Sequence, residues 1–496
     1  MQPFVPEQHP KPHTNCWLEQ QVKIAVISPL IRSLAVVALL LICSHPASPQ
    51  TNATELTAGK VIEKVAVQSH PDQSYAVFLP AAYTPEKSWP TMFCFDPRAR
   101  GSVAIERFVE AAKDLGYIVL CSNNSRNGLD WKTISQIFMD FWDDAHARFN
   151  IDEKRTYAAG FSGGSRLAST FASRCRGCLA GVVGAGAGFP GDVAPDSKTP
   201  FAYFGIVGTD DFNYVEMWEL EKKYASLNIP YHFETFAGGH EWPRANNIKN
   251  ALAWLTLQAM KAHLTTSDPQ FVESQINARV KAADELEKGQ DLLDAYKAYA
   301  SIVRDFQGLT DVSVALRGLE RLQKSPEIKK ETRNEEELFR RQLREAAEIR
   351  AAWFKAPEAD EARVPKHEAI IRLGDWRKKK ASETDSPDRR LARRIISHLL
   401  IESIESAQAS LRAEDYNSAL TNYELAHEAD PKNANLVYEL ARVYALKKQK
   451  KSALQSLEEA VSLGFKDIAR LKAEEAFTLL ADDARYQKLL TTMNGR

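Results

Sequence analysis

The sequence predicts an α/β fold with a mostly parallel sheet, followed by an all-α helical region. Up to about residue 265, blocks rich in β-branched and aromatic residues alternate with blocks of helical periodicity. Beyond that point the strand pattern ends, and long charged blocks with helical periodicity follow. The chain of 496 residues is too long for one hydrophobic core, so we expect several domains.

Eight segments have the continuous apolar character of strands that are covered on both faces. They are 61–67, 74–80, 91–95, 117–122, 155–160, 179–187, 201–207 and 231–237. Five segments between them have helical periodicity, namely 104–116, 133–149, 164–175, 214–228 and 247–260. Two strands followed by repeated strand–helix units predict a mixed, mostly parallel sheet with helices on both faces.

The N-terminal 1–50 segment predicts export. An uninterrupted apolar run from Ser33 to Cys43 follows Lys23 and Arg32 and precedes a stretch rich in Ser and Pro, which is the layout of a secretory signal peptide. The polar residues before it are unusually many for such a signal, so an uncleaved membrane anchor is the alternative. We therefore expect an exported protein, periplasmic or secreted, that contacts a membrane only if this segment stays as an anchor.

Four cysteines follow the apolar run, namely Cys94, Cys121, Cys175 and Cys178. An even number in an exported chain allows disulfides, but the sequence leaves their pairing open. The CxxC spacing of Cys175 and Cys178 has no second CxxC or histidine pair to complete a zinc site. We expect buried thiols or a structural bridge rather than a metal site.

The overall composition excludes several functional classes. A formal net charge of −1 and 44% hydrophobic residues describe a globular protein without a basic field for nucleic acid. The chain has no phosphate-binding loop, no dinucleotide fingerprint and no cluster of metal ligands. We therefore expect no cofactor, no metal and no nucleic-acid partner.

The strongest chemical signal is the segment Gly160-Phe161-Ser162-Gly163-Gly164. It follows a predicted strand and opens a predicted helix, which is the context that a nucleophile elbow requires. Glycines suit this turn because side chains beside the serine would collide with the strand or the helix. The helix N-terminus also directs unpaired N–H groups at the reacting atom.

A serine hydroxyl needs a base to take its proton, and that base needs a carboxylate to orient it. The next predicted strand is followed by Asp210 and Asp211, and the last predicted strand is followed by His240. Parallel strands deliver the residues after their carboxyl ends to one edge of the sheet, so we expect these side chains to meet Ser162. His232 and His146 lie inside predicted elements, and we expect structural or surface roles for them.

On "GFSGG", "GTDDF" and "GGHEW", residues 60 to 265 resemble the α/β-hydrolase superfamily. Within it the chain is similar to exported esterases related to polyhydroxybutyrate depolymerases and to feruloyl or acetyl-xylan esterases. The resemblance implies Ser162 as nucleophile, His240 as base and Asp211 as the acid, with Asp210 as the rival acid. It also implies a carboxylic ester as substrate.

The oxyanion hole departs from the pattern of those enzymes. Gly163 supplies one backbone N–H, but the second donor usually comes from a His-Gly loop that this chain lacks. The corresponding loop follows residue 95, so Phe95 or Asp96 is the expected donor, and Pro97 has no N–H to offer.

Two further segments bear on substrate access. Residues 121–131 follow the fourth strand and carry many side-chain donors, so they either contact substrate or form an Asx-rich turn. Only a short connection joins 179–187 to 201–207, which leaves little room for a helical lid. An open cleft that admits a bulky or polymeric ester is therefore expected, and the helical region is a candidate to cover it or to recruit a partner.

The C-terminal region contains an internal repeat. Ala419, Tyr423 and Ala426 recur as Ala453, Leu457 and Ala460, each 34 residues later (453 − 419, 457 − 423, 460 − 426). This period resembles the tetratricopeptide repeat, which implies a possible protein partner. An antiparallel helical bundle is the alternative. The expected domains are α/β-hydrolase at 55–265, charged helices at 266–399 and tetratricopeptide-like helices at 400–496.

The sequence therefore favours a serine esterase that acts through an acyl-enzyme intermediate. A peptidase or dienelactone-type hydrolase on the same fold is an alternative, because fold and triad do not fix the acyl substrate. A non-catalytic interaction protein that uses its helical repeats is the third possibility, although the presence of Ser, His and Asp disfavours it.

Overall fold

The computed structural model describes residues 56–191, 193–355, 364–384 and 386–494. The expected signal peptide or anchor lies outside the described residues. Among the helices that the structure does describe, none is long and apolar enough to cross a membrane.

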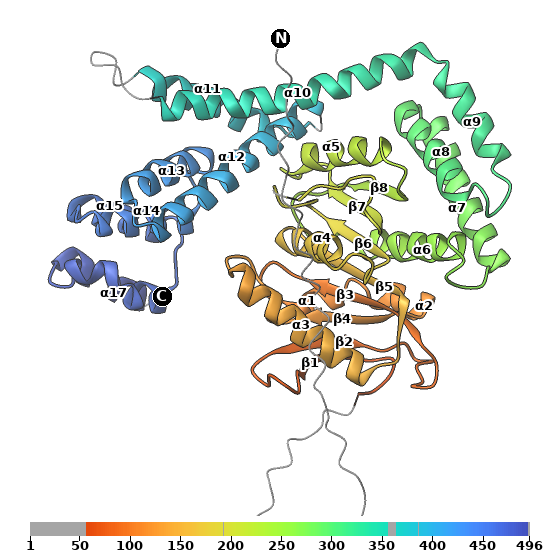
Figure 1. The fold of residues 1–496 in the computed structure, drawn as a ribbon. Coiled ribbons are helices and arrows are strands. Elements are labelled where there is room, and N and C mark those ends of the chain that lie inside the picture. Colours follow the sequence, from red (N-terminus) through yellow and green to blue (C-terminus); the bar gives the residue numbers. More distant parts are fainter. Residues whose placement is uncertain (1–55, 192, 356–363, 385, 495–496) are drawn as a thin grey trace, which may run out of the picture. The chain divides into compact units, whose positions relative to one another are not determined.

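All eight expected strands form one sheet in the order β1-β2-β4-β3-β5-β6-β7-β8 (Figure 1). Their bounds are β1 (Val61–Ala66), β2 (Ser74–Phe78), β3 (Trp89–Phe95), β4 (Ile118–Ser122), β5 (Ile151–Phe161), β6 (Gly181–Ala185), β7 (Ala202–Gly208) and β8 (Tyr231–Phe236). Strand β2 runs antiparallel to both of its neighbours, and the strands from β4 to β8 in this order are mutually parallel. The mixed, mostly parallel sheet is confirmed, and its fold is that of the α/β hydrolases.

Helices cover both faces of this sheet. They are α1 (Gly101–Ile105), α2 (Val109–Leu115), α3 (Trp131–Arg148), α4 (Gly163–Cys175), α5 (Tyr214–Ala225) and α6 (Ala245–Lys261). On β3, Met92 and Cys94 join the hydrophobic core under α1, α2 and α6, whereas Phe93 and Phe95 join the core under α3, α4 and α5. Because both faces are covered, the strand is apolar at successive positions rather than at alternate ones.

One expected helix, 104–116, is wrong in its extent. It is divided into α1 and α2, and the N–H groups of Arg107 and Phe108 bond to carbonyls three residues earlier. This tighter turn accompanies the full burial of Phe108, whose ring meets Trp242 edge-on at 6.2 Å between centroids.

The four cysteines that the structure describes divide into two kinds. Cys175 and Cys178 form a disulfide at the end of α4. Cys94 and Cys121 are free and buried, and they face each other as paired residues of β3 and β4. Both expected outcomes therefore occur: Cys175 and Cys178 form a structural bridge, and Cys94 and Cys121 are buried thiols.

The rest of the described chain is helical. The helices are α7 (Pro269–Lys288), α8 (Leu292–Phe306), α9 (Ser313–Gln323), α10 (Pro326–Phe354), α11 (Val364–Lys380), α12 (Pro387–Arg412), α13 (Tyr416–Ala429), α14 (Ala434–Leu446), α15 (Lys450–Ser462), α16 (Ile468–Ala473), the 3₁₀-helix η1 (Glu475–Leu480) and α17 (Ala484–Asn494). The repeated positions Ala419 and Ala453 are both fully buried, on α13 and α15. The expected boundary at 399/400 falls inside α12, so the two helical regions share this helix.

A buried carboxylate, Asp305 of α8, joins the sheet to the helices. It lies 2.7 Å from Nδ1 of His232 on β8 and accepts a hydrogen bond from Arg279 of α7 at 3.0 Å. Burial alone raises the pKa of Asp305, but His232, Arg279 and Arg304 outweigh it and lower the pKa to about 2. His232 therefore has the structural surroundings that the sequence suggested for it.

We expect this carboxylate to make the stability of the protein depend on pH. The pKa of Asp305 is below its ordinary value of 3.8, so its stabilising effect is complete above that value and is lost as the pH falls toward 2. Asp305→Asn should lower the free energy of unfolding by about 3 kcal/mol at neutral pH, because it removes the buried carboxylate that Arg279 and His232 contact.

Urea unfolding of the full chain as a function of pH measures this effect. The variant should also lose the part of the acid-dependent change that Asp305 contributes as the pH falls toward 2, whereas the exposed Asp482→Asn should behave as the wild type does. If Asp305→Asn and the wild type lost stability equally in acid, the proposed effect of Asp305 on the pH dependence of stability would be contradicted.

Candidate active site

Ser162 lies in the sharp turn between β5 and α4. Its backbone φ is +53°, in the left-handed region that side chains rarely adopt. The turn is possible because Gly160 and Gly164, two residues away on either side, have no side chains. A Cβ on Gly160 would lie 2.2 Å from the backbone of Gly164, and a Cβ on Gly164 would lie 2.1 Å from the carbonyl oxygen of Phe95. The glycines therefore have the role that the sequence indicated.

The structure brings Ser162, His240 and Asp211 together. Nε2 of His240 lies 2.8 Å from Oγ of Ser162, and Nδ1 lies 2.9 Å from both carboxylate oxygens of Asp211. A ring protonated on Nδ1 donates to Asp211 and accepts the Ser162 hydroxyl proton at Nε2. Asp211 is only 1% exposed and also accepts a hydrogen bond from the N–H of Asn213. This is the geometry of a nucleophile, base and orienting acid.

The neighbouring carboxylate Asp210 points elsewhere. It forms an ion pair with Arg393 of α12, and its backbone N–H donates to the carbonyl of Gly238. Of the two candidate acids that the sequence left open, the structure thus places Asp211 against His240.

We expect the two aspartates to differ sharply on substitution. Asp211→Asn should lower kcat for an ester substrate by roughly ten thousandfold, because an amide cannot hold the imidazole in the required tautomer. Asp210→Asn is the matched control and should retain activity within roughly tenfold. Steady-state kinetics of both variants measures the difference, and equal losses would contradict the assignment of Asp211.

The loop after β3 is organised around Asp96. Its buried carboxylate accepts hydrogen bonds from Arg100 at 3.0 and 2.9 Å, from Trp242 Nε1 at 2.8 Å and from the N–H of Arg98 at 2.8 Å. Burial alone raises the pKa of Asp96, but the hydrogen bonds from Arg100, Trp242 and Arg98 lower it below its ordinary value. The ionised side chain can only accept, so any hydrogen bond that Asp96 donates must come from its backbone.

Phe95 and Asp96 differ in position as oxyanion donors. Phe95 is the last residue of β3 and pairs with Gly160 of β5. Asp96 follows the strand and lines the same pocket as Ser162 and Gly163. This favours the N–H of Asp96 over that of Phe95 as the partner of Gly163. Sequence reasoning missed Arg100, which together with Trp242 holds the Asp96 carboxylate.

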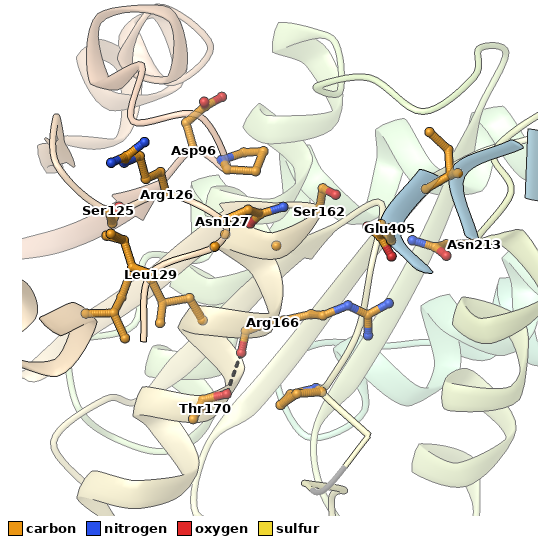
Figure 2. Close-up of a pocket in the computed structure, with 18 of the residues that line it drawn as sticks. Asp96, Ser125, Arg126, Asn127, Leu129, Ser162, Arg166, Thr170, Asn213 and Glu405 are labelled. Atoms are coloured by element: carbon orange, nitrogen blue, oxygen red, sulfur yellow. Dashed lines mark hydrogen bonds between the residues drawn. The ribbon is translucent and has the colours of Figure 1, made fainter. Parts of the chain in front are cut away.

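Ser162 opens into a pocket of about 720 Å³. Part of its lining comes from the 125–131 segment, including Asn127 and Trp131. The sequence left open whether this segment contacts substrate or forms an Asx-rich turn, and the structure places it at the border of the site. In the view of Figure 2, Ser162 lies between Asn127 on one side and Glu405 on the other. Glu405 belongs to α12, and sequence reasoning placed no residue of this helix at the site.

The pocket combines apolar and charged groups. Arg166 of α4 makes a two-pronged ion pair with Glu216 of α5, at 2.9 and 2.7 Å. Arg174, also on α4, lies over the ring of Trp131 at 4.3 Å. Within the described ranges, no cluster of three or more His, Cys, Asp or Glu residues could hold a metal ion.

Comparisons with known proteins agree with this description in part. Residues 410–475 match the family model described as a tetratricopeptide repeat, which confirms the predicted repeat over that range. No curated protein matches the chain.

Solved structures similar to the chain include several hydrolases. A fluorophosphonate-binding serine hydrolase of Staphylococcus aureus is 16% identical with a TM-score of 0.34, over 40% of this chain and 98% of that one. A ferulic acid esterase is 18% identical with a TM-score of 0.33, over 40% of this chain and 97% of that one. Est1E from Butyrivibrio proteoclasticus is 12% identical with a TM-score of 0.32, over 40% of this chain and all 100% of that one.

Proposed function

We propose that the protein is a serine hydrolase that cleaves a carboxylic ester through Ser162, His240 and Asp211. The observation that carries this proposal is the continuous chain of contacts from Ser162 Oγ through His240 to Asp211, at 2.8 and 2.9 Å. This series of contacts begins at the turn between β5 and α4, where Ser162 lines a pocket. An ester is the proposed substrate because the elbow, acid and histidine segments resemble those of exported esterases.

The reaction proceeds in two halves. Oγ of Ser162 attacks the carbonyl carbon while Nε2 of His240 takes the hydroxyl proton, and Asp211 stabilises the resulting imidazolium. The N–H groups of Gly163 and Asp96 stabilise the oxyanion, aided by the positive end of α4. The alcohol leaves with the proton from His240, and the acyl group stays on Ser162. Water then attacks the acyl carbon while Nε2 of His240 takes a proton from it, and His240 returns this proton to Oγ of Ser162 as the bond from Ser162 to the acyl group breaks and the acid leaves.

The pocket favours a substrate larger than an acetyl ester. Its volume of about 720 Å³ is in the range of sites that enclose a drug-sized molecule. A peptidase or a dienelactone-type hydrolase would use the same triad, and substrate assays separate these reactions. Protein binding through the helical repeats is proposed as a second property of the same chain.

Export is part of the proposal and rests on the sequence alone. The apolar run from Ser33 to Cys43 is the feature that supports it. Expression of the full chain with fractionation of the cells and medium, followed by N-terminal sequencing, distinguishes a cleaved signal from a retained anchor.

Hydrolysis of p-nitrophenyl acetate and methyl ferulate by the full chain tests the proposed activity. Rapid mixing with p-nitrophenyl acetate should show a burst of nitrophenol close to one equivalent per active site if deacylation is slower than acylation. Absence of turnover with both esters, together with turnover of a peptide or a dienelactone, would replace the ester by that substrate class.

A further inference from the structure

We propose that α12 is a wall of the active-site pocket and that its residue Ile401 selects the size of ester that reaches Ser162. This inference rests on the proposed esterase function and adds to it a determinant of specificity outside the α/β-hydrolase sheet.

The first argument is the spacing of the α12 residues at the pocket. His398, Ile401, Glu402 and Glu405 all line it. Their intervals of three, one and three residues put them on one face of a helix. The wall is therefore a continuous helical surface rather than a chance contact of one side chain.

The second argument is that this surface is held against the acid loop of the proposed triad. Arg393 pairs with Asp210, and Arg394 donates to the carbonyl of Thr209 at 3.2 Å. Arg394 is 6% exposed, and its guanidinium lies 4.7 Å from the centre of the Tyr214 ring. These contacts hold α12 against the loop that carries Asp211. They lie one to three helical turns before the residues of α12 that line the pocket.

The third argument concerns which side chains are available to a substrate. Glu402 is occupied by other partners, with Arg350 at 3.2 Å and His398 at 3.4 Å. Ile404 packs in the hydrophobic cluster shared with α13 and α14. Ile401, in contrast, belongs to none of the hydrophobic clusters formed by the described residues, although it lines the pocket. An apolar side chain placed in this way is suited to contact an apolar part of a substrate.

The position of the wall predicts selectivity by size. A small ester needs only the surroundings of Ser162, whereas a larger acyl or alcohol group extends into the space between α4 and α12. A change in the volume of a side chain on this wall should then alter kcat/KM for large esters and leave that for small esters almost unchanged. A few methylene groups change binding by roughly tenfold or more.

This inference is tested by measuring the hydrolysis of three esters by the full chain with pH-stat titration. Ethyl acetate is the small reference, ethyl hydrocinnamate enlarges the acyl side, and phenethyl acetate enlarges the alcohol side. Ile401→Trp should lower kcat/KM by roughly tenfold or more for at least one large ester and keep that of ethyl acetate within roughly twofold. Ile401→Ala, which cannot obstruct the pocket, should change the same ratio in the opposite direction.

Ala409→Trp is the matched control, since Ala409 is an exposed residue of α12 that does not line the pocket. It should leave all three rates unchanged. Equal effects of Ile401→Trp on the three esters, or no effect on any, would overturn the assignment of α12 while leaving the esterase activity intact. A wild type that hydrolyses none of them and does not react with a fluorophosphonate would overturn the proposed function and this inference together.

Discussion

Ser162→Ala should abolish nearly all ester hydrolysis without changing stability. We expect kcat to fall by at least roughly a thousandfold, because the variant has no nucleophile for the acyl-enzyme step. The free energy of unfolding should change by less than about 0.5 kcal/mol. Alanine accepts the same backbone conformation as serine, and the Ser162 hydroxyl is bonded only to His240 among the described residues.

A second serine of the same helix provides the control. The hydroxyl of Ser173 bonds to the backbone carbonyl of Ser169 within α4, so Ser173→Ala should retain activity. Ester hydrolysis by both variants and urea unfolding of each separate catalysis from folding. Substantial activity in Ser162→Ala would place the reaction elsewhere in the molecule.

Gly164→Ala should have the largest effect on folding. The added Cβ would lie 2.1 Å from the carbonyl oxygen of Phe95 and 2.7 Å from its carbonyl carbon. Neither atom is the mobile end of a side chain, so β3 and α4 must separate to admit the methyl group. We expect a loss of about 3 kcal/mol or more in the free energy of unfolding, measured by urea denaturation.

Gly191→Ala is the matched control for this substitution. Apart from its chain neighbours, no atom of the described residues lies within 4 Å of a Cβ there, so the exchange should leave stability almost unchanged. Equal stability of Gly164→Ala and wild type would show that the elbow is looser than its geometry implies.

The sheet and the elbow could be predicted from sequence because their signals are local. Strands covered on both faces are continuous apolar runs, and the glycines around Ser162 are required by contacts within a few residues and one neighbouring strand. The order Ser162, Asp211, His240 then followed from the carboxyl ends of parallel strands. These constraints act within one segment or between one segment and the next, so they can be recognised in the sequence.

Other features depend on tertiary contacts that no segment records. Asp210 and Asp211 follow the same strand, and only the position of Arg393 on a distant helix shows that Asp210 is engaged elsewhere. The break in 104–116 accompanies the burial of Phe108 against Trp242, a residue far along the chain. Periodicity detects neither contact, because it reports which face of a helix is apolar and not what covers it.

The pocket wall on α12 could not be foreseen for the same reason. His398 and Glu402 resemble an ordinary charged helix face in the sequence, and charge patterns of this kind usually mark solvent exposure. The sequence did indicate that the lid position was nearly empty and that the helical region was a candidate to cover the cleft. Which helix does so became visible only with the pocket lining.

Labelling of the full chain with a fluorophosphonate, followed by tryptic digestion and mass spectrometry, tests the central claim most directly. Cleavage after Arg155 and Arg166 releases the peptide 156–166, which contains both Ser162 and Ser165. The structure predicts that fragmentation places the phosphonate on Ser162 and that His240→Ala labels far more slowly, since His240 activates the hydroxyl. Labelling of Ser165 or of another peptide, or equal labelling of His240→Ala, would contradict the proposed triad.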